Sequence, residues 1–418
     1  MAAAALAALA AAPAPAHAVN PVHGKVVGAN PVDWTPDVLD GSVDQIVQMG
    51  DRIYLGGTFT RVRNPRKGRT VVRPYLVAVH ARTGVVDEAF NARLDRPVRA
   101  LLASPDGKAL YAGGEFRTAG GRATRALALL DARTGAAARG FAAPALDGIV
   151  YDLRRAGSRL LVGGSFTKVG RTARPALAAV NIRSGAVDNS LHLQIAGPRV
   201  SRTGQRAPVK VQAIDVTPDG KRAVVVGGFG MAAGRSRPQL AVLDLGTTVT
   251  LSAWHTARYA PYCATSIPAY LRDVDISADG RYFVVVTSGG PGRGTLCDTA
   301  ARFDFGRAAA DKQPTWVNYT GGDTLLSVAV TGAAVYVGGH QRWLDNPAGN
   351  NTQGPGAVRR EGIGAVHPQT GRALPWNPGK ERGVGTSELY ATKSGLWIGS
   401  DTARVAGERR ERVAFFPL

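Results

Sequence analysis

Short runs of apolar residues recur along the whole chain, and each run ends in a pair of small residues. The run Ile53-Tyr54-Leu55 leads into Gly56-Gly57, and later runs repeat this pattern at residues 110–114, 160–164, 224–228, 284–289, 335–339 and 396–400. Their first glycines lie at 56, 113, 163, 227, 289, 338 and 399, so the spacing is 49 to 64 residues. Apolar runs this short are typical of buried β-strands, and a recurrent spacing of this size indicates a repeat architecture.

Each repeat carries the signals of a four-stranded antiparallel sheet. In the second repeat, the apolar strand 98–103 runs into Ser104-Pro105-Asp106-Gly107, where proline presets φ and Asp-Gly favours a sharp turn. The strand ending in Gly113-Gly114 follows, and a third strand at 126–131 closes on the turn Thr134-Gly135. A fourth, outer strand is marked by an aromatic residue in most repeats: Phe90, Phe141, Trp254, Trp316 and Trp376. Seven such units predict an all-β, seven-bladed β-propeller with four-stranded antiparallel blades.

The two ends of the chain complement each other. The last repeat has strands near 388–390, 396–398 and 413–416 and lacks an outer strand. Residues 34–41 copy the junction between an outer strand and the next repeat that is found at 141–148. We therefore expect the N-terminal strand to complete the C-terminal blade, which removes an open sheet edge. Residues 19–418 would then form a single domain.

The repeat resembles a known family. Its motif is Tyr-x-Gly-Gly-x-Phe-Thr, a basic loop, and then Leu-Ala-x-Leu-Asp-x-x-Thr-Gly. This is similar to the bacterial delta-60-type β-propeller repeat, and the resemblance implies an exported actinobacterial propeller of undefined activity. More distantly, the double glycine resembles kelch repeats, and Asp-x-x-Thr-Gly resembles the blades of quinone-dependent dehydrogenases. Both of these features also have a purely structural cause in blade turns.

The N-terminus indicates export, and an oxidising compartment would permit the two cysteines to pair. Residues 1–18 are an apolar, alanine-rich run ending in Ala16-His17-Ala18, which predicts a secretory signal peptide; the alternative is a disordered alanine-rich tail. Cys263 and Cys297 are the only cysteines, so they either form one disulfide or remain free thiols, and they are too few for a structural zinc site. No later segment is apolar enough to predict a membrane span.

The chain has a net charge of +20, and many of its arginines fall in the loops between second and third strands. These loops share one face of a propeller, so they predict a basic surface for carboxylate- or phosphate-bearing partners. The alternative is the solvated rim of a basic protein. The candidate residues are Arg61, Arg63, Arg69, Arg122, Arg125, Arg171, Arg174, Arg235, Arg237, Arg359 and Arg360.

The innermost strands should line a central channel, and several of their early residues are polar. Carboxylates beside arginines there either bind a small polar ligand or cation, or solvate the channel and hydrogen-bond between blades. The candidates at the channel mouth are Asp44, Arg99, Asp152, Gln212, Arg272, Asp273 and Glu388.

These patterns favour a binding or scaffold protein over an enzyme. No Gly-x-Ser-x-Gly, His-Glu-x-x-His or phosphate-binding glycine loop occurs, so we expect no catalytic residues, no metal and no cofactor. The expected partner is an anionic cell-envelope polymer or an acidic protein, bound by a monomer. Nucleic acid is disfavoured because the basic loops lack interleaved aromatic residues. The alternative is a hydrolase, lyase or quinone-type enzyme with its site at the channel mouth.

Overall fold

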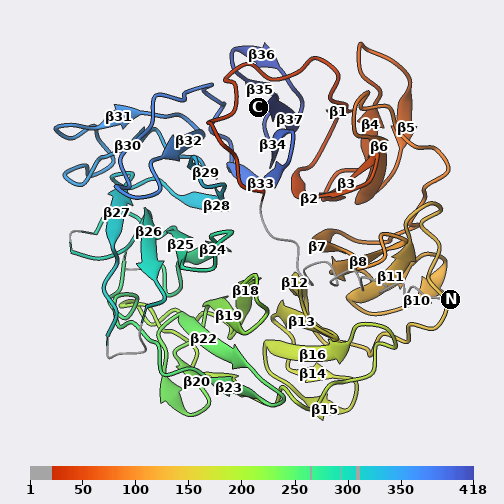
Figure 1. The fold of residues 1–418 in the computed structure, drawn as a ribbon, viewed down its shortest axis with the longest axis horizontal. Coiled ribbons are helices and arrows are strands. Elements are labelled where there is room, and N and C mark those ends of the chain that lie inside the picture. The colour runs from red at the N-terminus through yellow and green to blue at the C-terminus, as the bar shows by residue number, and fades with distance from the viewer. Residues whose placement is uncertain (1–20, 264–265, 293, 307–310) are drawn as a thin grey trace, which may run out of the picture.

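The computed structural model of the chain consists of β-strands arranged around a central axis (Figure 1). It describes residues 21–263, 266–292, 294–306 and 311–418. All named elements in these ranges are strands, so the described part contains no helix that could cross a membrane. The predicted signal peptide, residues 1–18, lies outside the described residues.

Seven sheets in the described residues share one antiparallel strand order, and we number them units 1 to 7. Their strands are β2 (Val43–Met49), β3 (Arg52–Gly57) and β6 (Leu76–His80); β7 (Val98–Ala103), β8 (Ala109–Gly114) and β11 (Leu127–Asp131); β12 (Val150–Ala156), β13 (Arg159–Gly164) and β16 (Leu177–Asn181); β18 (Val211–Val216), β19 (Arg222–Gly227), β22 (Leu240–Leu245) and β23 (Val249–Leu251); β24 (Leu271–Ile276), β25 (Tyr282–Thr287), β26 (Thr299–Asp304) and β27 (Trp316–Tyr319); β28 (Leu325–Val330), β29 (Val335–Gly339) and β32 (Ile363–Val366); β33 (Thr386–Thr392), β34 (Gly395–Ser400) and β37 (Val413–Pro417). The first strand of each unit lies beside the first strand of the next, and β33 lies beside β2.

A small hairpin projects from the loop between the second and third strands of most units. These peripheral hairpins are β4 (Arg61–Arg63) with β5 (Thr70–Val72), β9 (Thr118–Ala119) with β10 (Arg122–Ala123), β14 (Lys168–Val169) with β15 (Thr172–Ala173), β20 (Met231–Ala232) with β21 (Arg235–Ser236), β30 (Trp343–Leu344) with β31 (Val358–Arg359), and β35 (Arg404–Val405) with β36 (Glu408–Arg409). Two connecting strands, β1 (Asp37–Val38) and β17 (Ile195–Ala196), pair with β4 and β20.

The glycine pairs mark the second strands, as the sequence predicted, and their cause is steric. A Cβ on Gly57 would lie 2.1 Å from the carbonyl oxygen of Ser42. Ser42 directly precedes the first strand of the same unit. Only glycine allows this approach of two backbones. The second strands are the central strands of their sheets, so their apolar residues are buried on both faces.

The hydrophobic core lies between sheets rather than within one. Each of seven apolar clusters draws on two successive units, and the cluster that contains Val43, Ile46 and Trp397 joins unit 7 to unit 1. A fully buried side chain of this size contributes about 1.5–3 kcal/mol. No unit can bury its faces alone, so the units stabilise one another around the ring.

The outer edge of most units differs from the expected fourth strand. Among the described residues, only units 4 and 5 have a named fourth strand, β23 and β27, while units 1, 2, 3 and 6 form a single bridge pair such as Val79 with Val86. Arginine side chains replace the missing ladder. In unit 1, Arg73 donates hydrogen bonds to the carbonyl oxygens of Glu88 and Phe90 on the outer segment. Strand pairing at this edge therefore ends after one bridge, yet these carbonyl oxygens still accept hydrogen bonds.

The N-terminal segment lies along the outer edge of unit 7. The N–H groups of Gly28 and Val32 donate to the carbonyl oxygens of Pro417 and Phe415 on β37. Arg410 donates to the Val32 carbonyl, as Arg73 does on unit 1. The ring of Trp34 packs against Trp397 and Phe415, with centroid separations of 5.6 Å to each.

Trp34→Ala should destabilise the fold, because it removes the aromatic anchor of this segment. We expect a loss of about 3 kcal/mol in the free energy of unfolding, seen as a lower thermal midpoint. Trp34→Phe, which keeps an aromatic contact, should lose much less. An unchanged midpoint in Trp34→Ala would show that the segment does not stabilise unit 7.

Candidate functional site

The first strands of the seven units surround a cavity of about 640 Å³ on the central axis. All seven residues predicted at the channel mouth line this cavity: Asp44, Arg99, Asp152, Gln212, Arg272, Asp273 and Glu388. They come from β2, β7, β12, β18, β24 and β33, so the repeat register alone brings them together.

A bulge at the start of every first strand divides these residues into two layers. In each unit, the register with the second strand shifts between the first and third residues of the first strand. A bulge leaves one residue outside the ladder and redirects its side chain. The bulged residues are Asp44, Arg99, Gln212 and Arg272, and the residues of the next layer are Asp152, Asp273 and Glu388.

Two carboxylates of the second layer, Asp152 and Asp273, each link their own unit to the next one. Asp152 accepts hydrogen bonds from the N–H of Leu153 at 2.8 Å and, in the following unit, from the N–H of Ile214 at 2.7 Å. Asp273 repeats this arrangement with Val274 at 2.8 Å and Val328 at 3.0 Å. These N–H groups lie on innermost strands, which have no partner strand on the channel side. The carboxylates therefore satisfy backbone donors that the sheet leaves unpaired.

A third layer, two residues further along the strands, was not predicted. Asp215 accepts from the N–H of Ile276 at 2.7 Å, and Asp275 accepts from the N–H of Val330 at 2.6 Å. The signal was present in the sequence, because Asp273 and Asp275 are two residues apart on one strand and so share a face.

Arg154 on β12 is the cation among these carboxylates. It forms ion pairs with Asp152 and, at 3.5 Å, with Asp215. Its charge also acts on Asp273 and Glu388. The cavity wall carries more carboxyl groups than cations, so a cation does not stand beside each carboxyl group. Burial, which favours the neutral form of a carboxyl group, therefore has the largest effect on their pKa values.

Burial raises the pKa of every second- and third-layer carboxyl group. The pKa of Asp152 rises from 3.8 to about 6 in spite of the opposing charge of Arg154, and that of Asp273 rises to about 7 in spite of its backbone hydrogen bonds. Burial also raises the pKa of Glu388 and Asp275 well above their ordinary values. Groups that exchange protons near neutral pH are available here for acid–base chemistry. No cluster of metal-ligating side chains occurs among the residues that the structure describes.

The bulged layer at the mouth is largely paired within the protein. Arg99 forms ion pairs with Asp44 at 2.8 Å and with Glu115 at 2.9 Å. Arg272 donates to the hydroxyl of Ser288, and Gln212 accepts from Lys210.

Three of the arginines predicted on the basic face hold the fold together instead. Arg237 and Arg360 are buried and donate to the carbonyl oxygens of Ser252 and Leu374 on the outer segments. Arg174 donates to the side chain of Asn189. All three occupy the repeat position of Arg73 and Arg410, so they belong to the same set of outer-edge clamps.

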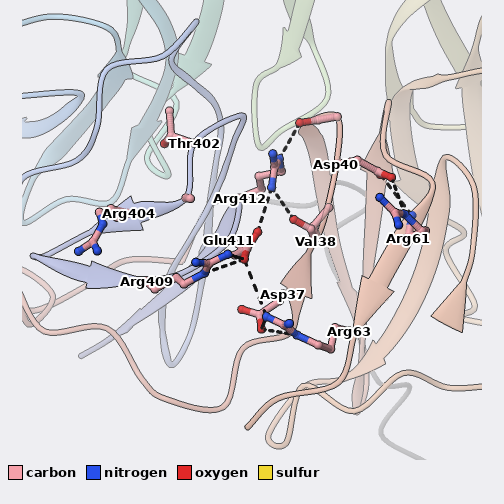
Figure 2. Close-up of polar contacts among 12 residues, drawn as sticks. Asp37, Val38, Asp40, Arg61, Arg63, Thr402, Arg404, Arg409, Glu411 and Arg412 are labelled. Carbon is pink, nitrogen blue, oxygen red and sulfur yellow. Dashed lines mark hydrogen bonds and ion pairs between the residues drawn. The ribbon is translucent and has the colours of Figure 1, made fainter. Parts of the chain in front are cut away.

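Four more predicted arginines are paired with carboxylates. Arg61 contacts Asp40, Arg69 contacts Glu88, and Arg359 contacts Glu361. Arg63 contacts Asp37 and lies 3.8 Å from Glu411, which is only 4% exposed. Figure 2 shows Glu411 between Arg409, Arg412 and the Asp37–Arg63 pair, where units 7 and 1 meet. In the same view, Arg412 donates to the carbonyl oxygens of Gly41 and Val38.

The remaining four arginines are exposed. Arg122, Arg125, Arg171 and Arg235 make no side-chain hydrogen bond or ion pair with the residues that the structure describes. Arg122, Arg171 and Arg235 belong to the peripheral hairpins of units 2, 3 and 4, and Arg125 follows the hairpin of unit 2. We refer to these three successive hairpins as the arc. In unit 1, Arg66 and Lys67 at the turn between β4 and β5 are also exposed and make no side-chain hydrogen bond or ion pair with the described residues. The free cations of the hairpins therefore lie on units 1 to 4 rather than all around the ring.

Cys263 and Cys297 form a disulfide, which is one of the two alternatives left open by the sequence. The other alternative was two free thiols. It lies in unit 5, which has no peripheral hairpin in its described part. The sulfur of Cys263 packs where a side chain on Gly289 would otherwise lie.

Comparison with known proteins supports the fold alone. No family model matches the chain, and no curated protein matches its sequence. Solved structures similar to it include U3-55K (TM-score 0.54, 11% identity, covering 93% of this chain and 100% of that one) and the Cps50 (Swd1) β-propeller domain of Myceliophteria thermophila (0.50, 12%, 91% and 99%). The computationally designed Ika8 protein is also similar (0.50, 10%, 93% and 100%). The chain thus has a propeller-like, all-β fold.

Ionisation of the channel should make stability fall as the pH rises. The folded protein holds the protons of Asp152 and Asp273 more tightly than the unfolded chain does, since their pKa values rise from 3.8 to about 6 and about 7. Their contribution is complete below about pH 4 and is lost as the pH passes through these values. Calorimetry should therefore show a lower thermal midpoint at about pH 8 than at about pH 5, and Asp273→Asn should reduce the difference.

Asp279→Asn provides the matched control. Burial opposes ionisation of Asp279, but hydrogen bonds from Ser277 and Arg281 together outweigh it and lower the pKa of this carboxyl, so it stays ionised throughout this pH range. This variant should keep the full pH dependence. If Asp273→Asn keeps it too, the channel carboxyls do not cause it.

Proposed function

We propose that this chain is an exported, seven-bladed propeller that acts as a binding module for an anionic partner. Each of the units 1 to 7 would be one blade, and residues 28–34 would take the place of the fourth strand in the last blade. The partner would be an envelope polymer or an acidic protein, bound through the basic hairpin face. The observation that carries this proposal is the set of exposed arginines on hairpins β9–β10, β14–β15 and β20–β21 that have no partner among the described residues.

Several contacts support ring closure at the N-terminus. The outer-edge clamp is the same on unit 7 as on other units, except that Arg410 holds Val32 from the far end of the chain. Trp34 follows Val32 by two residues, as Trp376 follows Leu374 and Trp254 follows Ser252 after their own clamp sites. The repeat register is therefore continuous across the two ends.

Export is supported by the disulfide. A bond between Cys263 and Cys297 is expected to persist in an oxidising compartment and not in a reducing cytosol. The predicted signal peptide agrees with this compartment. Under export, the partners available to a basic surface are envelope polymers and extracellular proteins rather than chromosomal DNA.

Binding is favoured over catalysis because the channel carboxylates already have a structural task. Asp152, Asp215 and Asp273 each accept a backbone hydrogen bond from the following unit, which leaves fewer oxygens for a substrate. The exposed arginines on the hairpins have no such internal task.

One observation favours a second candidate, an acid–base enzyme in the channel. Asp215 and Asp275 hydrogen-bond to each other in the cavity wall, and burial raises the pKa of both. A carboxyl pair that shares a proton is able to supply an acid and a base. Turnover of aryl glycosides or esters that disappears in Asp275→Asn, with the fold intact, would establish this activity.

Binding to an anionic polymer should be strongly salt-dependent. Contacts by about three arginines would lower the affinity roughly 40-fold between 50 and 200 mM salt, if release of condensed counterions follows the behaviour of nucleic acids. Binding of the full chain to heparin, measured by titration at several salt concentrations, checks this expectation. Failure to bind heparin above the level seen with uncharged dextran would contradict an anionic polymer as the partner.

A further inference from the structure

The exposed cationic surface is uneven around the ring, although arginine is common in every unit. On the hairpins of units 1, 6 and 7, exposed arginines face carboxylates: Arg69 with Glu88, Arg359 with Glu361, and Arg404 with Glu381. The hairpin turn of unit 1 also carries two exposed cations without a partner among the described residues, Arg66 and Lys67. On the hairpins of units 2, 3 and 4 the described residues offer no arginine–carboxylate pairs. The local field of the latter three units is therefore more positive than the net charge alone implies.

One register position explains much of this difference. The residue before each third strand adopts a positive φ in all units: Tyr75, Ala126, Ala176, Gln239, Asp298, Gly362 and Arg412. The residue preceding it is Glu361 in unit 6 and Glu411 in unit 7, and these glutamates pair with Arg359 and Arg409. In units 1 to 4 the same position holds Pro74, Arg125, Pro175 and Pro238, and in unit 1 Arg69 pairs with Glu88 on the outer segment instead. The acid is thus absent where the arginines are free.

Carboxylates in the segments that connect successive units do not pair with the exposed arginines of units 2 and 3. Asp95 accepts hydrogen bonds from the N–H groups of Arg117 and Thr118 at the start of β9. Asp147 accepts from Thr167 and Lys168 at the start of β14. Both carboxylates are therefore bonded to backbone donors rather than to the guanidinium groups of Arg122 or Arg171.

The hairpin turns project these arginines outward. Gly120 and Gly121 in unit 2, and Ala233 and Gly234 in unit 4, have positive φ values of 48° to 82°, which is the conformation of tight two-residue hairpins. Arg122 and Arg235 directly follow these turns. In Figure 1, β10, β15 and β20 lie in sequence along one side of the rim, so the exposed arginines sit on successive projections.

We propose that the hairpins of units 2, 3 and 4, with Arg122, Arg125, Arg171 and Arg235, form the binding surface for an extended polyanion whose repeated charges contact more than one unit at once. This deepens the proposed function and rests on it. A small anion would reach the arginines of one hairpin only, whereas a chain of sulfate, phosphate or carboxylate groups would add contacts along the arc. Arginine forks suit all three groups.

The surface favours a polymer over a folded acidic protein. Protein interfaces are organised around buried aromatic and apolar anchors. Exposed large apolar side chains in the described residues are scattered, and on these three hairpins only Met231, 40% exposed, is one of them. Stacking aromatics of the kind that hold single-stranded nucleic acid are missing there as well.

The test compares two triple variants that remove the same charge. Arg122→Ala/Arg171→Ala/Arg235→Ala removes three unpaired arginines from the arc, and Arg69→Ala/Arg359→Ala/Arg404→Ala removes three paired arginines from units 1, 6 and 7. Binding of each to heparin, polyphosphate and polygalacturonate is measured at several salt concentrations. The arc variant should bind the preferred polymer about 10- to 100-fold more weakly and show a salt slope lower by roughly 2 to 3, while the control variant stays within about threefold of wild type.

The outcomes separate this inference from the proposed function. Equal losses in both variants would overturn the arc and leave anion binding by net charge in place. Absence of wild-type binding to every polymer and to a folded acidic protein would overturn both. A sulfated disaccharide that competes as well as heparin at equal sulfate concentration would overturn the extended partner. Binding to a folded acidic protein but to none of the three polymers would overturn the extended polyanion and leave the proposed function in place. Unchanged thermal midpoints confirm that both variants are folded.

Discussion

The open edge of each innermost strand is the constraint on which the rest of this structure depends. Such a strand has a partner on one side only, so half of its backbone donors face the channel. The preceding unit supplies the acceptors: Asp152 and Asp215 bond to Ile214 and Ile276, and the hydroxyl of Tyr390 accepts from Gln48 across the junction of units 7 and 1. These bonds fix the spacing of neighbouring sheets. They also place carboxyl groups in the centre of a protein whose net charge is +20.

At the outer edge of the sheets, arginine side chains supply hydrogen bonds to backbone carbonyls that have no partner strand. Where the ladder stops after one bridge pair, a guanidinium group with several donors in a fixed geometry binds backbone carbonyls of the outer segment. Arg73 reaches the carbonyls of Glu88 and Phe90 in unit 1. Arg360 places two donors on the Leu374 carbonyl in unit 6, and Arg410 binds the Val32 carbonyl. A large part of the arginine content therefore stabilises the fold. Composition overstates the charge available to a partner, and only the exposed, unpaired arginines inform function.

The sequence repeat allowed the strands and the set of channel residues to be predicted. It did not reveal contacts that depend on how the units meet in space. Glycine pairs and Trp34 were visible because backbone contact and aromatic packing restrict residue type. The set of channel residues followed from register alone. The two layers within that set did not, because a bulge changes pairing without changing the apolar pattern. Arg235 and Arg237 illustrate the same limit: they are two residues apart in one basic loop, yet one is exposed and the other is buried against Ser252. Arg237 shares the repeat position of Arg73 and Arg410, but only the carbonyl that it contacts in space shows what this position does.

The centre and the rim carry opposite charge, and this limits how one ligand could use both. A polyanion on the arc would be repelled by the carboxylates of the channel, unless Asp152, Asp273 and Glu388 took up protons, which becomes harder as the pH rises through the raised pKa values. Conversely, a cationic or neutral ligand suited to the channel gains nothing from Arg122 or Arg171. A binding partner on the hairpins and a substrate in the channel would therefore be different molecules, and an activity found for one would say nothing about the other.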